Sequence, residues 1–252
     1  MKRREKTRDN RDYDTTQLRE AGHGRTLGRD YNGHFFRWSF ARRLITAKDN
    51  VLEVGCGEDK PLSKILTGGA AAHVNTYVGV DLNKLKASNS QRLTFIGEFN
   101  FVERWKELLK QRPEGWDVLV HMEVLEHMHS RHQLPFLKAC FACLKPGGVM
   151  LMSTPVYDGV RHAANHIAEV DVPTLQKMVE KAGFVVVKRW GVYMDIKGIG
   201  KAEIDPKLSA AVKVLRPALA DYFDNDALSN FFAPIYPDNA RNNLWRVIKP
   251  VK

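Results

Sequence analysis

The order of strand-like and helix-like patterns along the 252-residue chain is the feature that most limits its fold. Seven short apolar runs are separated, for most of the chain, by segments with the spacing of amphipathic helices. Such alternation predicts a largely parallel sheet with right-handed crossovers and helices on both faces. The expected strands are residues 51–54, 77–81, 93–96, 117–121, 149–153, 185–189 and 244–248.

The first apolar run ends in a glycine-rich turn, VLEVGCG at residues 51–57. Glycines after a buried strand allow backbone N–H groups to approach a ligand closely. Asp81 closes the second run, where a carboxylate could hold the two hydroxyls of a ribose. The pair predicts a nucleoside-bearing cofactor, and the alternative is a tight strand-to-helix connection without a ligand.

The residues after this turn argue against a dinucleotide. A dinucleotide site needs a third glycine, but Gly57 is followed by Glu58, Asp59, Lys60 and Pro61. The acidic pair would repel a pyrophosphate, so the cofactor should carry no phosphate there. Glu53 could instead face a cationic amino group.

Four motifs together resemble class I S-adenosylmethionine-dependent methyltransferases. They are EVGCG at 53–57, Asp81, EVLEH at 123–127 and LKPGG at 144–148, in the family's order over about residues 51–190. The resemblance implies an α/β fold with a Rossmann-like, seven-stranded, mostly parallel sheet whose last two strands are antiparallel. It also implies S-adenosylmethionine as cofactor, with Gly55 and Gly57 facing its methionine part, Glu53 its amino group and Asp81 its ribose. The implied cofactor-binding set is Glu53, Gly55, Cys56, Gly57, Asp81, Leu82, Glu98, Phe99 and Met122.

A second group of polar residues follows the fourth expected strand. If a helix begins there, Glu123, Glu126 and His127 share one face at the carboxyl end of the strand. With His166 as a fourth ligand, or His162 next, these residues could bind a divalent metal such as Mg, Mn, Fe, Co or Zn. The pattern resembles small-RNA 3′-terminal 2′-O-methyltransferases and ubiquinone-biosynthesis O-methyltransferases.

Two alternatives to a metal site remain open for these four predicted catalytic residues. Without a metal, His127 or His166 could act as a general base near neutral pH. The group could also be purely structural. His121, His129 and His132 fit the geometry less well and are expected at the surface or behind the first layer of site residues.

The expected methyltransferase domain is residues 46–252. One extra segment precedes this domain, and a second is inserted within it. Residues 1–45 form a basic and aromatic N-terminal extension, with a helix expected from residue 27. This helix either covers the sheet or acts as a lid that carries Arg29, Tyr31 or His34 over the cofactor. Residues 191–241 form an unusually long connection between the last two strands, expected to be a wall of the substrate site.

Net charge suggests the acceptor. A formal charge of +10 favours an anionic partner, so the leading prediction is O-methylation of a nucleic acid or nucleotide. The alternatives are a small-molecule O-methyltransferase acting on a phenol or metabolite, and an inactive module that binds the cofactor and a partner.

The apolar segments and the cysteines indicate in which cellular compartment the protein is expected. No stretch approaches the roughly 18 apolar residues of a membrane span, and the basic N-terminus has no apolar core of a signal peptide. Cys56, Cys140 and Cys143 cannot all pair and are expected as buried thiols. A cytoplasmic protein without a membrane partner is therefore expected, and the sequence predicts no particular oligomeric state.

Overall fold

The structure is a computed structural model that describes residues 11–15, 29–68, 73–86, 89–160, 163–195, 197, 199–200 and 203–251. Within helix and strand, the side chains of residues 29–35 and 193 are also outside the described set. The lid residues Arg29, Tyr31 and His34 and the alternative ligand His162 therefore fall outside what the structure describes.

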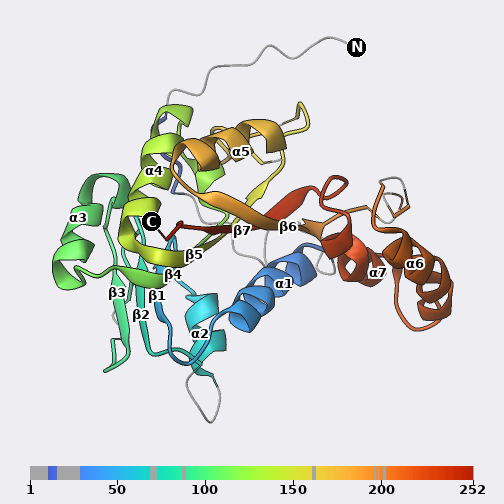
Figure 1. Ribbon diagram of the computed structural model, residues 1–252, viewed down its shortest axis with the longest axis horizontal. Coiled ribbons are helices and arrows are strands. Elements are labelled where there is room, and N and C mark those ends of the chain that lie inside the picture. The colour runs from blue at the N-terminus through green and yellow to red at the C-terminus, as the bar shows by residue number, and fades with distance from the viewer. Residues whose placement is uncertain are drawn as a thin grey trace.

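Within the described residues, seven strands form one sheet in the order β3-β2-β1-β4-β5-β7-β6 (Figure 1). The first five strands are parallel, and β7 runs antiparallel to both β5 and β6. This confirms the predicted fold class and the antiparallel last pair. The strands are β1 Asn50–Val54, β2 Thr76–Val80, β3 Leu93–Ile96, β4 Trp116–Met122, β5 Leu144–Pro155, β6 Val185–Tyr193 and β7 Asn242–Ile248.

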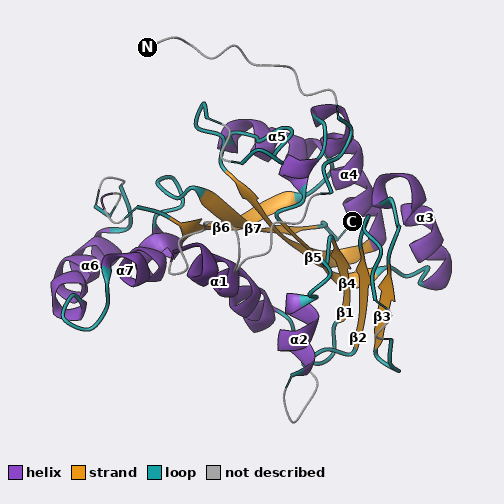
Figure 2. Ribbon diagram, turned by 180° about the vertical axis from the view of Figure 1, so that it is seen from behind, coloured by secondary structure: helices purple, strands orange, loops and turns teal. Residues whose placement is uncertain are grey.

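Helices cover both faces of the sheet (Figures 1 and 2). On one face lie α1 (Arg29–Leu44) and α2 (Pro61–Thr67), and on the other lie α3 (Phe101–Gln111), α4 (Ser130–Cys143) and α5 (Val172–Lys181). Among the described residues, no helix is long and apolar enough to cross a membrane.

The apolar residues of the central strands are buried on both faces, as a covered parallel sheet requires. Leu52 and Leu119 pack with α3, α4 and α5, while Val51 and Val120 pack with α1 and α2. His121 belongs to the first of these faces. It is fully buried and makes a T-shaped contact with the Phe136 ring, so burial excludes the surface position, which was one of its two expected places. Burial lowers the pKa of His121 to about 3.

The connection between β6 and β7 folds into helices rather than loop. It contains α6 (Pro206–Leu219), α7 (Asn225–Phe232) and a 3-10 turn, Ala233–Ile235, which enclose a small apolar core of their own around Phe232 and Tyr236. α6 and α7 lie at the end of the molecule opposite α3 (Figures 1 and 2). The predicted insertion therefore exists, and its role at the substrate site remains a prediction.

Candidate active site

The glycine turn after β1 has the backbone conformation that its sequence demands. Gly55 and Gly57 have φ angles of +77° and +68°, in the left-handed region that favours glycine. A Cβ at Gly55 would lie 2.4 Å from Val124 Cγ2, so this turn packs directly against the segment that follows β4. A Cβ at Gly57 would meet no described heavy atom within 4 Å, so the peptide there is open to a ligand.

Asp81 joins this turn to the loop after β2. One carboxylate oxygen accepts a hydrogen bond from the Gly57 N–H at 2.9 Å, and the other accepts from the Asn83 N–H at 2.8 Å. Each oxygen keeps a second lone pair, which is what a ribose diol requires. The predicted ribose position is therefore geometrically suitable.

Glu53 is buried beside the same turn and accepts a hydrogen bond from the Tyr77 hydroxyl. Burial raises the pKa of Glu53 to about 8, against the lowering effect of the Tyr77 hydrogen bond. A buried carboxyl group of this kind would be stabilised as an anion by a cation such as the amino group of S-adenosylmethionine. The residues of this turn thus fit the cofactor that the motifs imply.

The other predicted cofactor positions divide by exposure. Cys56, Phe99 and Met122 are buried, whereas Leu82 and Glu98 are exposed. The Phe99 N–H donates to the Asp81 main-chain oxygen at 2.9 Å, which places Phe99 next to the ribose position. Contacts between these five residues and the cofactor remain predictions.

The segment after β4 differs from the predicted helix start. Glu123 adopts a φ of +55°, and the only helical residues before α4 in this described segment form one 3-10 turn, Leu125–His127. Because no α-helix begins at Glu123, the expected spacing of three and four residues does not place Glu123 with Glu126 and His127.

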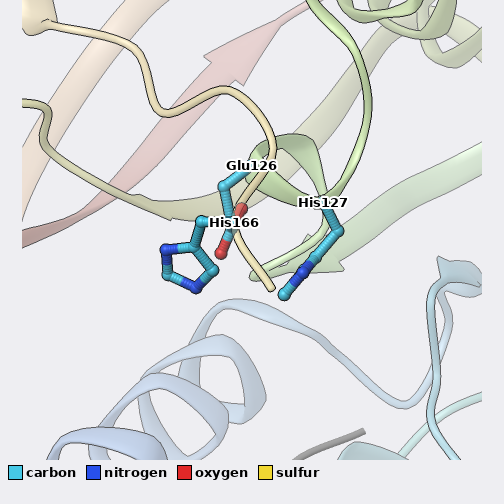
Figure 3. Close-up of side chains that lie close together, drawn as sticks. All are labelled: Glu126, His127 and His166. Carbon is cyan, nitrogen blue, oxygen red and sulfur yellow. The ribbon is translucent and has the colours of Figure 1, made fainter. Parts of the chain in front are cut away.

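Glu126, His127 and His166 do lie together. Each offers one ligand atom, and these three atoms lie within 4.8 Å of one another (Figure 3). The His166 loop is fastened to the 3-10 turn, since the N–H groups of Ile167 and Ala168 both donate to the Glu126 main-chain oxygen. The buried Gln133 side chain also joins the two segments by donating to the carbonyls of Leu125 and Ala168.

Both histidines are oriented through their Nδ1 atoms. His127 Nδ1 lies 3.0 Å from the main-chain oxygen of Asn165, which can only accept, so Nδ1 carries the proton. His166 Nδ1 pairs with a carboxylate oxygen of Glu169. A carbonyl or carboxylate on one ring nitrogen is the usual arrangement for a histidine that binds metal through the other.

The Glu126 side chain is fully buried, and only one of its two carboxylate oxygens has a hydrogen-bond partner among the described residues. One of its oxygens accepts from Thr154 Oγ1 at 3.1 Å, and the other, Oε1, has no hydrogen-bond partner in the described residues. Burial and the nearby Glu123 charge raise the pKa of Glu126 well above its ordinary value. An oxygen left in this state beside two histidines fits a bound cation.

The Glu123 carboxylate is held by residues of other elements. Its carboxylate accepts from Ser153 Oγ at 2.7 Å and from Asn242 Nδ2 at 2.6 Å, and it forms an ion pair with Arg37 at 3.4 Å. Glu123 therefore joins β5, β7 and α1, and it lies outside the three-residue cluster. These contacts do not favour Glu123 as a further ligand, and its role at the metal stays a prediction.

Four contributors to the site were not assigned from the sequence. Glu169 lies three residues after His166, a spacing that could have identified it. Gln133, Arg37 and Asn242 carry no local motif and reach the site only through tertiary packing.

Comparison with known proteins indicates the family of the chain. A family model described as a methyltransferase domain matches residues 32–189. A probable S-adenosylmethionine-dependent methyltransferase of Mycolicibacterium smegmatis is 30% identical over 172 residues, 65% of this chain and 61% of that protein. A ubiquinone biosynthesis O-methyltransferase of Pseudomonas fluorescens is 30% identical over 115 residues, 44% of this chain and 47% of that protein. The matches thus span about half of these relatives' lengths.

A solved structure shares the fold. The S-adenosylmethionine-dependent methyltransferase from Archaeoglobus fulgidus aligns with a TM-score of 0.55 at 15% identity, covering 86% of this chain and 94% of that one. The family match extends over more than half of the chain and includes the glycine turn, Asp81 and the Glu126 segment. The chain therefore belongs to the class I S-adenosylmethionine-dependent methyltransferases.

Proposed function

We propose that this chain transfers a methyl group from S-adenosylmethionine to a hydroxyl oxygen, with a divalent metal held by Glu126, His127 and His166. The observation that carries the proposal is the buried Oε1 of Glu126, which has no hydrogen-bond partner among the described residues and lies beside two histidines whose Nδ1 atoms face oxygens. The positions of the two turns support it, because Gly55 and Val124 are packed together, and a donor at the first turn and an acceptor at the second would then meet at one edge of the sheet.

A bound metal would act as a Lewis acid that lowers the pKa of the acceptor hydroxyl. Two imidazoles and one carboxylate favour Zn, Fe or Co over Mg or Mn. The protein's own part is to hold the reacting groups in line, since transfer from a sulfonium needs positioning more than covalent help.

Two classes of acceptor have support from different observations. The net charge of +10 favours a nucleic acid or nucleotide, whose phosphates would be attracted to the protein. The ubiquinone biosynthesis relative favours a small hydroxylated aromatic compound. We take the nucleic-acid class as the first candidate and the small-molecule class as the second.

Paired substitutions test the metal part. Glu126→Gln removes the carboxylate that would bind the metal, and we expect it to weaken Zn²⁺ or Co²⁺ binding at least about tenfold. Glu123→Gln is the matched control, because Glu123 lies outside the cluster and should leave the metal affinity within a few-fold. Isothermal titration calorimetry with each metal measures these affinities without any methyl acceptor. Equal losses in the two variants would restore the four-ligand arrangement, and no binding by the unaltered chain would refute the metal.

Labelled cofactor tests the transfer itself. The chain is incubated with radiolabelled S-adenosylmethionine and either an RNA pool or a metabolite pool, with and without a chelator. We expect label on oxygen in one pool and its loss with the chelator. Label on nitrogen, or transfer that the chelator does not affect, would contradict metal-assisted O-methylation.

A further inference from the structure

The short segment of residues 11–15, here named the strap, lies against the loop that carries His127. Tyr13 and Met128 form an isolated antiparallel bridge. In it the Asp14 N–H donates to the His127 oxygen, and the His129 N–H donates to the Asp12 oxygen, each at 2.8 Å. The main chain of a predicted metal ligand is thus hydrogen-bonded to a segment more than 100 residues away in sequence.

The strap is anchored on the first turn of α4. The Tyr13 ring stacks on the His132 ring with centroids 5.0 Å apart and an angle of 24° between the planes. The Asp12 carboxylate forms an ion pair with Arg131, and one of its oxygens lies 3.2 Å from His132 Nε2. Since Asp12 and Arg131 are about half exposed, their pair adds little stability, and the partly buried Tyr13 ring is the main anchor.

The same segment reaches two more loops of the site. The Thr15 oxygen accepts from Asn83 Nδ2 at 3.2 Å, and the Asn83 N–H in turn donates to Asp81, the predicted ribose residue. Arg11 Nη2 lies 3.5 Å from the Ala164 oxygen, two residues before His166. Five consecutive residues therefore touch the loops after β2, β4 and β5.

We propose that Tyr13 is a positioning residue, which docks the strap on α4 so that the strap fixes the His127 loop and the Asp81 loop together. Its effect on the metal rests on the function proposed above, while its effect on the cofactor does not. The strap would then couple the cofactor site to the metal site. Loosening the strap should weaken the binding of cofactor and of metal together, although the strap supplies no ligand atom to the cluster.

Two substitutions at Tyr13 test this coupling. Tyr13→Ala removes the ring, whereas Tyr13→Phe keeps the stacking on His132, loses only the hydroxyl that hydrogen-bonds with the Asn100 side chain, and serves as the matched control. For Tyr13→Ala we expect the dissociation constants of S-adenosylhomocysteine and of Co²⁺ each to rise about tenfold, the loss typical of groups that orient ligands. Tyr13→Phe should remain within about twofold of the unaltered chain. Hydrogen exchange of the His129 amide should accelerate only in Tyr13→Ala.

The outcomes separate this inference from the proposed function. If the His129 amide loses protection while both dissociation constants stay unchanged, the strap does not position the site and the inference is overturned. If the unaltered chain binds no metal but Tyr13→Ala weakens S-adenosylhomocysteine, the metal proposal fails and the coupling to the cofactor loop stands. An unaltered melting temperature in Tyr13→Ala would show that the losses are local.

Discussion

At the scale of single residues, Glu53 is the group most sensitive to pH beside the cofactor turn. Burial raises its pKa from 4.5 to about 8, so the folded chain keeps this proton over a range in which the unfolded chain has lost it. The free energy of unfolding should therefore fall as pH rises from about 4.5 to about 8, by at most about 1.4 kcal/mol per pH unit from this group.

The variant Glu53→Gln should lack this dependence. We expect its stability relative to the unaltered chain to be greater at pH 7.5 than at pH 5.5, as measured by urea unfolding at both pH values. Asp59→Asn removes an exposed carboxylate of the same loop and is the control, with no comparable difference expected. If Glu53→Gln has the same effect at both pH values, Glu53 is not protonated in the folded state near neutral pH.

A substitution at Gly57 should affect both the stability of the fold, through backbone strain, and the affinity for the cofactor. Gly57→Ala should cost about 1 kcal/mol of stability, because a left-handed φ is unfavourable for alanine. If the cofactor passes over this peptide, the added methyl group should also weaken S-adenosylhomocysteine binding by about tenfold, equivalent to 1.4 kcal/mol.

Gly200 offers a matched control for this change. It also has a positive φ, +83°, and no described heavy atom would lie within 4 Å of a Cβ there. Gly200→Ala should therefore show a similar loss of stability in thermal unfolding and an unchanged cofactor affinity. If the unaltered chain, Gly57→Ala and Gly200→Ala bind S-adenosylhomocysteine with similar affinity, the cofactor does not approach Gly57.

At the scale of elements, the close packing of β6 against the insertion gives a test of its role. A Cβ at Gly191 would lie 2.2 Å from the Ala233 main-chain oxygen and 2.7 Å from Ala240 Cβ. Gly191→Ala should therefore displace the insertion and cost about 1–3 kcal/mol of stability.

If the insertion is a wall of the substrate site, Gly191→Ala should also raise the KM for the acceptor more than the KM for the cofactor. Val187→Ala, on the same strand but about half exposed, should change stability by less than about 0.5 kcal/mol and leave both constants unaltered. An unaltered acceptor KM in Gly191→Ala, despite its lower stability, would exclude the insertion from substrate binding.

The segments after β1 and β4 show which elements a sequence can predict. The turn after β1 can be predicted because glycine is the residue type that favours the positive φ angles found there. The turn after β4 cannot be, because Glu123 adopts a positive φ that its residue type does not favour. Its conformation is held by Ser153, Asn242 and Arg37, partners far away in sequence that no local pattern reveals.

At the scale of the whole molecule, the fold class followed from the sequence more completely than the site did. Alternating apolar runs and helical patterns leave few topologies for a covered parallel sheet, and the observed order agrees with the expected class. The cluster of Glu126, His127 and His166 depends instead on two loops brought together by main-chain hydrogen bonds. The sequence named these three residues as candidates, but it could not show that Glu123 lies outside the group that they form.

The net charge of the molecule leads to a test of the acceptor class. For a nucleic-acid acceptor, each phosphate bound releases counterions, so the logarithm of KM should rise with the logarithm of salt concentration by about 0.7–0.9 per phosphate contact. A chain with a net charge of +10 that makes several such contacts should lose most of its apparent affinity between low and physiological salt. Steady-state methylation of an RNA pool across a salt series measures the slope, and the KM for the cofactor in the same series is the control. A small phenolic acceptor would show almost no slope, because its affinity depends on burial of apolar surface rather than on released ions.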